Sequence, residues 1–324
     1  MTQAARALVH AFETGALKPQ RAFFLRAELS PFRDVDAEQS FRPEYLRLKK
    51  AGWSVVPRIE SGAYQLGQLL LTKHKEENFA NIARAWSLLA EGGTLVCSGS
   101  NDDGAASLEK QAGKALGLDG QLSKFHCRVF WLTRADKNPP DYWRDLASLR
   151  PVGDGSWLSQ PGIFSWDRID DGSALLAAHL PDDLSGHVAD FGCGWGYLAR
   201  QILGRCPGIA KIDLIDAEHR AIEAAQANIA DARASFHWLD LTQEAAPATY
   251  DAILCNPPFH AGRAAEPGLG QNVITAAARA LRPGGVFYMV ANRGLPYEPI
   301  LKANFTSFAT LADNNKFRVS RAIR

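Results

Sequence analysis

Cysteine is scarce in this sequence of 324 residues, and no two cysteines have a metal-binding spacing. The five cysteines, an odd number, are Cys97, Cys127, Cys193, Cys206 and Cys255, and none belongs to a Cys-x-x-Cys pair. This pattern argues against a disulfide framework and a structural zinc site, and it favours a location in the reducing cytoplasm. The eight histidines also lack ligand-like spacing, so we expect no metal.

Long apolar runs and a strong net charge are absent as well. No run approaches the roughly 20 apolar residues of a membrane helix, and residues 1–12 lack the cleavage pattern of a signal peptide, so we expect no membrane segment. The net charge of +1 does not by itself indicate a nucleic-acid partner. Residues 1–150 carry 21 Lys and Arg against 17 Asp and Glu, and residues 151–324 carry 15 against 18. This mild asymmetry leaves open a basic docking face on the first half.

The length and the local composition indicate two domains. At roughly 150 residues per domain, 324 residues suffice for two, and the 46% hydrophobic content supports ordinary globular cores. Residues 150–160 are rich in Gly, Pro and Ser, which is typical of a linker. We therefore predict domains over residues 1–155 and 156–324.

Short apolar runs alternate with one-sided apolar stripes in both halves, which predicts alternating strands and helices. The expected strands cover residues 21–29, 53–59, 64–71, 94–97, 188–191, 210–216, 235–239, 252–254 and 286–290. The stripe that starts at Phe79 is one of the helical segments between them. The pattern predicts an α/β fold with a mainly parallel, doubly wound sheet.

A weak internal repeat relates the two halves. Residues 64–97 and 250–290 each begin with Tyr and an apolar run, continue through a striped helix and a Gly-Gly pair, and end in a strand. Where the second copy has Asn256 to Phe259, the first has Thr72 to Lys75, and no glycine-rich turn precedes the first copy. The repeat favours a duplicated fold whose first copy lost its chemistry. Two α/β domains with the same generic rhythm are the alternative.

Glycines and acids follow the strands of the second half. The first strand runs into Asp190-Phe-Gly192-Cys193-Gly194-Trp-Gly196, where a ligand can approach the backbone and a helix start offers free N–H groups. Gly-x-Gly-x-Gly alone is a weak signal, since related glycine patterns open dinucleotide-binding folds. However, Asp216 and Asp240 end the next two strands, and ligands bind beyond the carboxyl ends of such sheets. Asp216 could hold two ribose hydroxyls and Asp240 could read an adenine amine. Each could instead cap a helix or a loop.

The run Asn256-Pro257-Pro258-Phe259 ends the strand that contains Ile253. Proline fixes φ and removes a backbone donor, so the loop is stiff and presents an amide, carbonyls and an aromatic ring in fixed positions. These groups suit a planar amine such as a nucleobase, although prolines also end strands without any function. Strand alternation turns the neighbouring Cys255 away from the loop, so we expect no nucleophile there.

These motifs together resemble class I S-adenosylmethionine-dependent methyltransferases that act on a planar nitrogen. More closely, they resemble the bacterial 16S ribosomal RNA guanine-N2 methyltransferases of the small subunit. The resemblance rests on Gly162-Ile-Phe164-Ser, Asp190-Phe-Gly-Cys-Gly, Asn256-Pro-Pro-Phe-His-x-Gly262, Ala291-Asn292, Leu295-Pro-Tyr297 and Phe317-Arg-Val-Ser-Arg-Ala-Ile323. It is close over residues 160–324 and looser before them. Trp195 departs from the pattern, since a small residue is usual between the last two glycines.

The resemblance implies a Rossmann-like catalytic domain preceded by a degenerate methyltransferase-like domain that supports RNA binding. It implies a monomeric cytoplasmic enzyme with S-adenosylmethionine as cofactor and ribosomal RNA or the small ribosomal subunit as partner. We assign catalysis to Asn256, Pro257, Pro258 and Phe259, cofactor binding to Phe164, Asp190, Gly192, Cys193, Gly194, Gly196, Asp216, Asp240 and Asn256, and substrate binding to Phe259 and His260.

In the implied reaction the guanine is swung out of its stack, and Phe259 stacks on it. The Asn256 side-chain oxygen and the Pro257 carbonyl accept the two amine hydrogens, which turns the lone pair toward the methyl group. A glutamine side chain of a protein, a guanine of the large-subunit RNA or a DNA adenine would present similar NH₂ geometry, so these substrates stay open. A non-catalytic RNA-binding assembly factor is a further alternative.

Overall fold

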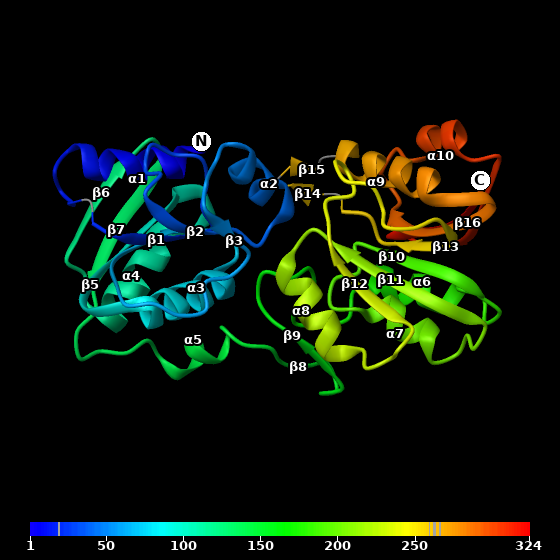
Figure 1. Cartoon of the computed structure of the whole chain (residues 1–324), viewed down its shortest axis with the longest axis horizontal. Helices are drawn as coiled ribbons and strands as arrows, with labels where there is room; N and C mark the ends of the chain where they lie inside the picture. The colour runs from blue at the N-terminus through cyan, green and yellow to red at the C-terminus, as the bar shows by residue number, and fades with distance from the viewer. Residues whose placement is uncertain (19, 259, 262–263, 266) are drawn as a thin grey trace. The chain divides into compact units, whose positions relative to one another are not determined.

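The computed structural model describes residues 1–18, 20–258, 260–261, 264–265 and 267–324. The chain divides into two units (Figure 1). The first comprises Met1–Arg150 and Gln160–Gly162, and the second comprises Pro151–Ser159 and Ile163–Arg324. The boundary predicted between residues 155 and 156 falls in the segment 151–159, which belongs to the second unit.

The first unit is built on a seven-stranded sheet in the order β3-β2-β1-β4-β5-β7-β6. Its strands are β1 (Ala22–Leu25), β2 (Val35–Glu38), β3 (Val55–Val56), β4 (Tyr64–Leu70), β5 (Leu89–Ser100), β6 (Gly120–Lys124) and β7 (Cys127–Thr133). The helices are α1 (Gln3–Glu13), α2 (Arg42–Lys50), α3 (Lys75–Leu88), α4 (Ala105–Leu116) and α5 (Asp141–Asp145), with a 3-10 turn at Asn101–Asp103. Strands β1 to β5 pair in parallel, and β7 pairs antiparallel with β5 and β6.

The second unit repeats this architecture with the strand order β12-β11-β10-β13-β16-β18-β17. Its sheet contains β10 (Gly186–Phe191), β11 (Ile209–Asp216), β12 (Ala234–Trp238), β13 (Tyr250–Cys255), β16 (Leu281–Asn292), β17 (Ser307–Asp313) and β18 (Phe317–Ile323). The helices are α6 (Asp171–His179), α7 (Tyr197–Leu203), α8 (His219–Asn228), α9 (Pro267–Ala280) and α10 (Glu298–Asn304). Two short ladders, β8 (Arg150–Val152) with β9 (Trp157–Ser159) and β14 (His260–Ala261) with β15 (Ala264–Ala265), complete the described elements.

Alternate residues along the second sheet enter two different cores, because successive side chains of a strand point to opposite faces. Val188, Leu214 and Leu254 pack with α6, α7 and α8 on one face. Ala189 and Cys255 pack with α9 and α10 on the other, and Figure 1 shows these helix groups on opposite sides of the sheet. Burial on both faces is typical of a doubly wound parallel sheet. The predicted α/β fold class is confirmed.

The shared strand order supports a duplication more strongly than the sequence could. In each unit the tyrosine that begins the fourth strand donates its hydroxyl hydrogen to an aspartate on the second strand. Tyr64 donates to Asp36 at 2.8 Å, and Tyr250 donates to Asp213 at 2.9 Å. A generic strand–helix rhythm does not require a matching side-chain pair inside each sheet.

The strand registers correct one detail of the predicted repeat. They pair Ala22 with Leu66 in the first sheet and Val188 with Ala252 at the corresponding place in the second. This correspondence sets Leu70, the last residue of β4, against Asn256. The alignment of residues 72–75 with 256–259 is therefore wrong by two positions, because it matched the ends of two apolar runs of different length, whereas the strand registers match their starts.

Candidate functional site

The turn between β10 and α7 holds three glycines in the left-handed region. The φ angles of Gly192, Gly194 and Gly196 are 74°, 53° and 90°. A Cβ atom at Gly196 would lie 2.9 Å from Ile229 Cδ1, so this glycine permits close packing of α7 against the end of α8. A Cβ atom at Gly194 would meet nothing within 4 Å, so this glycine leaves open space beside the backbone. The two positions therefore have different physical reasons for glycine.

Asp190, the next-to-last residue of β10, is completely buried. Its Oδ2 accepts a hydrogen bond from the Ala199 backbone N–H at 3.1 Å, and its Oδ1 has no hydrogen-bond partner among the described residues. Burial raises the pKa of Asp190 to about 7, and the nearby Asp216 carboxylate contributes to the rise. A buried acceptor without a partner is costly, so this oxygen suits a ligand that brings a hydrogen-bond donor or a positive charge.

Asp216 ends β11, and its carboxylate is hydrogen-bonded to the glycine turn. Its Oδ2 accepts from the Gly194 N–H at 2.9 Å, and its Oδ1 accepts from the Glu218 N–H at 2.8 Å. Burial raises the pKa of Asp216 to about 6, although these two backbone hydrogen bonds lower it. The carboxylate therefore fixes the turn. Each oxygen can accept a further hydrogen bond, so its assignment to the cofactor ribose stays a prediction.

Asp240 is buried and organises the loop that follows β12. Its Oδ1 accepts from the backbone N–H of Thr242 at 2.9 Å and from the hydroxyl of Thr242 at 2.6 Å. Its Oδ2 accepts from Gln243 Nε2 at 2.6 Å. These contacts support the alternative interpretation, in which Asp240 caps a loop. The role of Asp240 toward an adenine amine stays a prediction.

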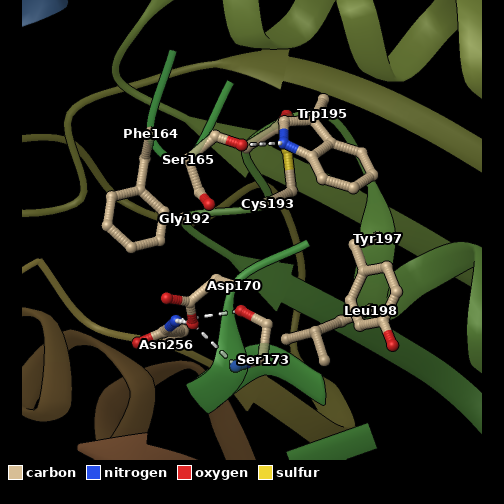
Figure 2. A pocket seen from close by; sticks show the side chains of 11 residues that line it. Phe164, Ser165, Asp170, Ser173, Gly192, Cys193, Trp195, Tyr197, Leu198 and Asn256 are labelled. Carbon is tan, nitrogen blue, oxygen red and sulfur yellow. Dashed lines mark hydrogen bonds between the residues drawn. The ribbon is translucent and has the colours of Figure 1, made fainter. Parts of the chain in front are cut away.

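The glycine turn and the residue that follows β13 line one pocket (Figure 2). The pocket has a volume of about 410 Å³, open solvent included. It is lined by Phe164, Ser165, Asp170, Ser173, Gly192, Cys193, Gly194, Trp195, Tyr197, Leu198 and Asn256. Four of the predicted cofactor positions, Phe164, Gly192, Cys193 and Gly194, therefore line a single pocket together with the Asn256 amide.

Asn256 is held by two side chains that the sequence did not single out. Its Nδ2 donates to Asp170 Oδ2 at 3.0 Å and to Ser173 Oγ at 2.9 Å, as Figure 2 shows. Asp170 and Ser173 lie at the start of α6, more than 80 residues earlier in the chain. An Asp followed three positions later by Ser before an apolar stripe is a helix-start signal, and this signal could have located the helix although not its contact with Asn256.

The remaining predicted residues differ in what the structure says of them. Pro257 is buried and Pro258 is exposed beside Asn256. Phe259 lies outside the described residues, and for His260 only the backbone, in β14, is described. Cys255 is buried in the core beneath α9, and burial raises the pKa of its thiol. Because the thiolate is the reactive form, this supports the rejection of Cys255 as a nucleophile.

Phe164 is 58% exposed although it lines the pocket, which is consistent with its predicted place beside a ligand. Trp195, the departure from the family pattern, is buried and donates its indole N–H to the Ser165 carbonyl at 3.3 Å. It also packs edge-on against Trp157, with ring centroids 4.9 Å apart. The Trp195 side chain therefore connects the glycine turn to Trp157 by packing, and to the segment that carries Phe164 by its hydrogen bond to Ser165.

Neither a metal-binding cluster nor a membrane-spanning helix occurs among the residues that the structure describes. Residues 1–18, 20–258, 260–261, 264–265 and 267–324 contain no group of three or more His, Cys, Asp or Glu side chains able to hold a metal ion. Within those same ranges, every helix is too short or too polar to span a bilayer.

The sequence is similar to known methyltransferases along most of its length. A family model described as the methyltransferase small domain matches residues 155–321. The ribosomal RNA small subunit methyltransferase C of Shewanella baltica is 33% identical over 239 residues, which cover 71% of this chain and 68% of that protein. The protein of the same name from Pseudomonas aeruginosa is 32% identical over 278 residues, covering 82% of this chain and 81% of that protein.

The fold also matches a solved structure over nearly the whole chain. A 16S rRNA N2 methyltransferase of T. thermophilus, in complex with AdoMet and guanosine, aligns with a TM-score of 0.79. The alignment covers 99% of this chain and 93% of that one at 24% sequence identity. At this identity the match supports the two-domain methyltransferase fold and nothing finer.

Proposed function

The chain belongs to the ribosomal RNA small subunit methyltransferase C family, and we propose that it transfers a methyl group from S-adenosylmethionine to the exocyclic N2 amine of a guanine in small-subunit ribosomal RNA. Family membership confirms the resemblance read from the sequence, and with it an S-adenosylmethionine-dependent ribosomal RNA methyltransferase. A protein glutamine and a DNA adenine would suit the same acceptors, and membership in this family favours ribosomal RNA over both.

One observation carries the proposal: the glycine turn and Asn256 line the same pocket. A methyl transfer needs the donor and the acceptor side by side, because holding two reactants in line contributes up to about 7–11 kcal/mol to lowering the barrier. The turn between β10 and α7 supplies the cofactor side, and the loop after β13 supplies the amine side. Parallel strands place both at the same edge of the sheet.

The residues of the turn fit S-adenosylmethionine in charge and in shape. The open space at Gly194 lets a ligand approach the backbone, and the unpartnered Asp190 Oδ1 is a buried acceptor for a cationic or N–H-bearing ligand. In this proposal Phe164 covers the cofactor, Gly192, Cys193 and Gly194 cradle it while Gly196 shapes the end of the turn, and Asp216 and Asp240 hold its nucleoside end. S-adenosylmethionine supplies an activated methyl group on a sulfonium, so the protein needs no covalent intermediate.

In the proposed reaction the protein must orient a weak nucleophile, the guanine N2 amine. The lone pair of the guanine N2 amine is delocalised into the ring. Acceptance of its two hydrogens by Asn256 Oδ1 and the Pro257 carbonyl turns the lone pair out of the ring plane, toward the methyl group. Extruding the base costs a few kcal/mol, and stacking on Phe259 returns about 1–3 kcal/mol. Pro258 stiffens the loop, and His260 lies next to it in the chain.

We also propose that the first unit supports RNA binding and that the enzyme works as a monomer in the cytoplasm. The five cysteines are unpaired and buried, which suits a reducing compartment. Light scattering on the pure protein tests the monomer.

Nucleoside mass spectrometry of ribosomal RNA tests the proposed reaction. RNA from cells that lack the gene should lose one N2-methylguanosine of the small subunit, and the purified protein should restore it when given S-adenosylmethionine. Supplying naked RNA and assembled subunits in parallel identifies which of the two is the substrate. An unchanged methylguanosine content, or a lost mark on another base, would contradict the proposal.

A further inference from the structure

We propose that Asp170 is a positioning residue that fixes the amide orientation of Asn256, so that the side-chain oxygen of Asn256 faces the methyl acceptor. This inference deepens the proposed function and rests on it. It concerns a contact between the start of α6 and the end of β13, two segments that are 86 residues apart in the sequence.

A carboxylate accepts hydrogen bonds and donates none, whereas the Asn amide has a donating and an accepting end. Asp170 Oδ2 lies 3.0 Å from Asn256 Nδ2, and the Ser173 hydroxyl oxygen lies 2.9 Å from the same nitrogen. A rotated amide would set Asn256 Oδ1 against the carboxylate oxygen and leave a part-buried acceptor facing another acceptor. Asp170 therefore selects one of the two amide orientations. Figure 2 shows the nitrogen of Asn256 turned toward Asp170 and Ser173, and the oxygen turned away from them.

Asp170 is itself fixed by the helix that it caps. Its Oδ2 accepts the Ser173 backbone N–H at 2.8 Å, which satisfies one of the free donors at the start of α6. Gly172 lies close to this carboxylate: a Cβ atom there would lie 3.0 Å from Asp170 Oδ2 and 3.1 Å from Phe317 Cε1, so a larger residue at this position would crowd the carboxylate. The cap at the start of α6 thus fixes the Asp170 carboxylate, and this carboxylate in turn fixes the orientation of the Asn256 amide.

The consequence for the reaction follows from the two ends of the amide. With Oδ1 presented, Asn256 accepts a hydrogen of the guanine amine and helps to hold its lone pair out of the ring plane. With Nδ2 presented, two donors would face each other and the amine would lose that hydrogen bond. Loss of Asp170 should therefore impair turnover more than the binding of cofactor or RNA.

Three variants separate positioning from simple helix capping. Asp170→Ser keeps a capping oxygen for the Ser173 N–H but is too short to reach Asn256. Asp170→Asn keeps both contacts, because the Ser173 N–H requires an acceptor and so holds the oxygen of the new amide where Oδ2 was. Asp171→Asn is the matched control, since Asp171 is the exposed neighbour that pairs with Lys316 at 3.7 Å.

Each variant is assayed for kcat and KM on small-subunit RNA, for S-adenosylmethionine affinity by calorimetry and for melting temperature. We expect kcat of Asp170→Ser to fall at least about tenfold, a change that corresponds to roughly 1.4 kcal/mol. Its KM, cofactor affinity and melting temperature should stay close to those of the wild type. Asp170→Asn should regain most of the lost turnover, and Asp171→Asn should match the wild type throughout.

Unchanged kcat in Asp170→Ser, or equal losses in Asp170→Ser and Asp170→Asn, would overturn the inference. If Asp170→Ser does not fold, Asp170→Thr serves instead: it also keeps a capping oxygen for the Ser173 N–H and is too short to reach Asn256, and an unaltered kcat in that variant would also count against the proposal. A wild-type protein that does not methylate guanine N2 would instead contradict the proposed function, so the two failures are distinguishable.

Discussion

At the scale of single residues, the site depends on polar groups that the fold removes from water. Asp190 is the clearest case, because one of its oxygens is buried without a partner and its pKa is about 7. Such a carboxyl group disfavours its charged form until an opposite charge arrives. Asp190 therefore lowers the stability of the free protein, and we propose that it contributes to binding the cofactor.

The raised pKa of Asp190 predicts a measurable pH dependence of stability. The folded-state pKa, about 7, lies above the ordinary value of 3.8, so between these pH values the folded chain holds a proton that the unfolded chain has lost. Stability from this group is present at low pH and decreases as the pH rises toward 7. Denaturant titrations of the free protein at pH 4 and pH 8 should show that Asp190→Asn removes this decrease, which amounts to at most about 4 kcal/mol.

The same experiment has an internal control. Asp216 titrates in the same range and its carboxylate interacts with Asp190, so the wild type and Asp190→Asn are compared both with and without Asp216→Asn. Equal pH dependence in the two proteins would mean that Asp190 is charged in the free protein. The Asp190→Asn variant should also bind S-adenosylmethionine more weakly at pH 8, because the negative charge that the cofactor would meet is gone.

The sequence predicts individual site residues only where a local rule places them. Asp190, Asp216 and Asn256 were identifiable because each follows an apolar run, and parallel strands bring their ends together. Asp170 and Ser173 were not, because their contact with Asn256 depends on the packing of α6 against the sheet. No pattern within a few residues encodes a contact across 86 positions.

At the scale of elements, the turn between β10 and α7 performs two tasks with glycines of the same conformation. Gly196 makes room for the packing of helices, and Gly194 makes room beside the backbone where the pocket begins. A motif search treats the two glycines alike. The structure gives Gly196 a role in the fold, and we propose that Gly194 serves the ligand.

Alanine substitutions should reveal this division. Gly194→Ala has a strained φ, which costs about 1–2 kcal/mol, but it meets no neighbour, so the fold should persist while cofactor affinity falls at least about tenfold. Gly196→Ala has a φ of 90°, farther from the left-handed minimum, and must also displace the end of the Ile229 side chain, so it should lose about 1 kcal/mol more stability than Gly194→Ala. Melting curves and calorimetry on both variants measure the two effects. Equal stability losses together with equal affinities would refute the assignment.

Predicted elements agree with the structure where apolar periodicity is strong and differ where pairing is tertiary. The stripe from Phe79 belongs to α3, and the run before the glycine turn is β10. The run expected over residues 53–59 forms only Val55–Val56, because β3 is an edge strand with one short partner. The antiparallel strands β6, β7, β17 and β18 were not expected, since they extend beyond the strand–helix alternation that the sequence displays.

At the scale of the whole molecule, two copies of one fold carry different residues at equivalent positions. The strand registers set Phe24, Arg26, Gln39 and Leu70 of the first unit against Asp190, Gly192, Asp216 and Asn256 of the second. The first unit thus keeps the sheet and lacks the acids, the glycine and the amide. The loss of these side chains from a retained sheet agrees with the degenerate first domain expected from the sequence.

The first unit has built an ion pair where the second keeps its glycine turn. Arg26, with a φ of 55°, donates from Nη1 to Glu77 Oε1 at 2.8 Å, and the Thr72 hydroxyl donates to Glu77 Oε2 at 2.9 Å. Glu77 is buried, with 3% of its surface exposed. A large cationic side chain thus stands at the position where the second unit has Gly192.

We therefore expect one S-adenosylmethionine per chain. Calorimetric titration of the wild type should give a stoichiometry of one, and the Gly194→Ala variant should weaken that single site. Arg26→Ala should lower stability by about 1–3 kcal/mol, because it removes the guanidinium that pairs with the buried Glu77 carboxylate, and should leave the cofactor titration unaltered. A second equivalent of cofactor, or binding lost through Arg26→Ala, would contradict the assignment of the site to the second unit.

We propose that Asn256 orients the guanine amine for attack and contributes little to holding the cofactor. Methyl transfer to small-subunit RNA and S-adenosylmethionine affinity are measured side by side for Asn256→Ala, with Asp216→Ala as the reciprocal control. We expect Asn256→Ala to abolish methyl transfer while S-adenosylmethionine still binds. We expect Asp216→Ala to weaken cofactor binding. Transfer at the wild-type rate by Asn256→Ala would contradict this proposal.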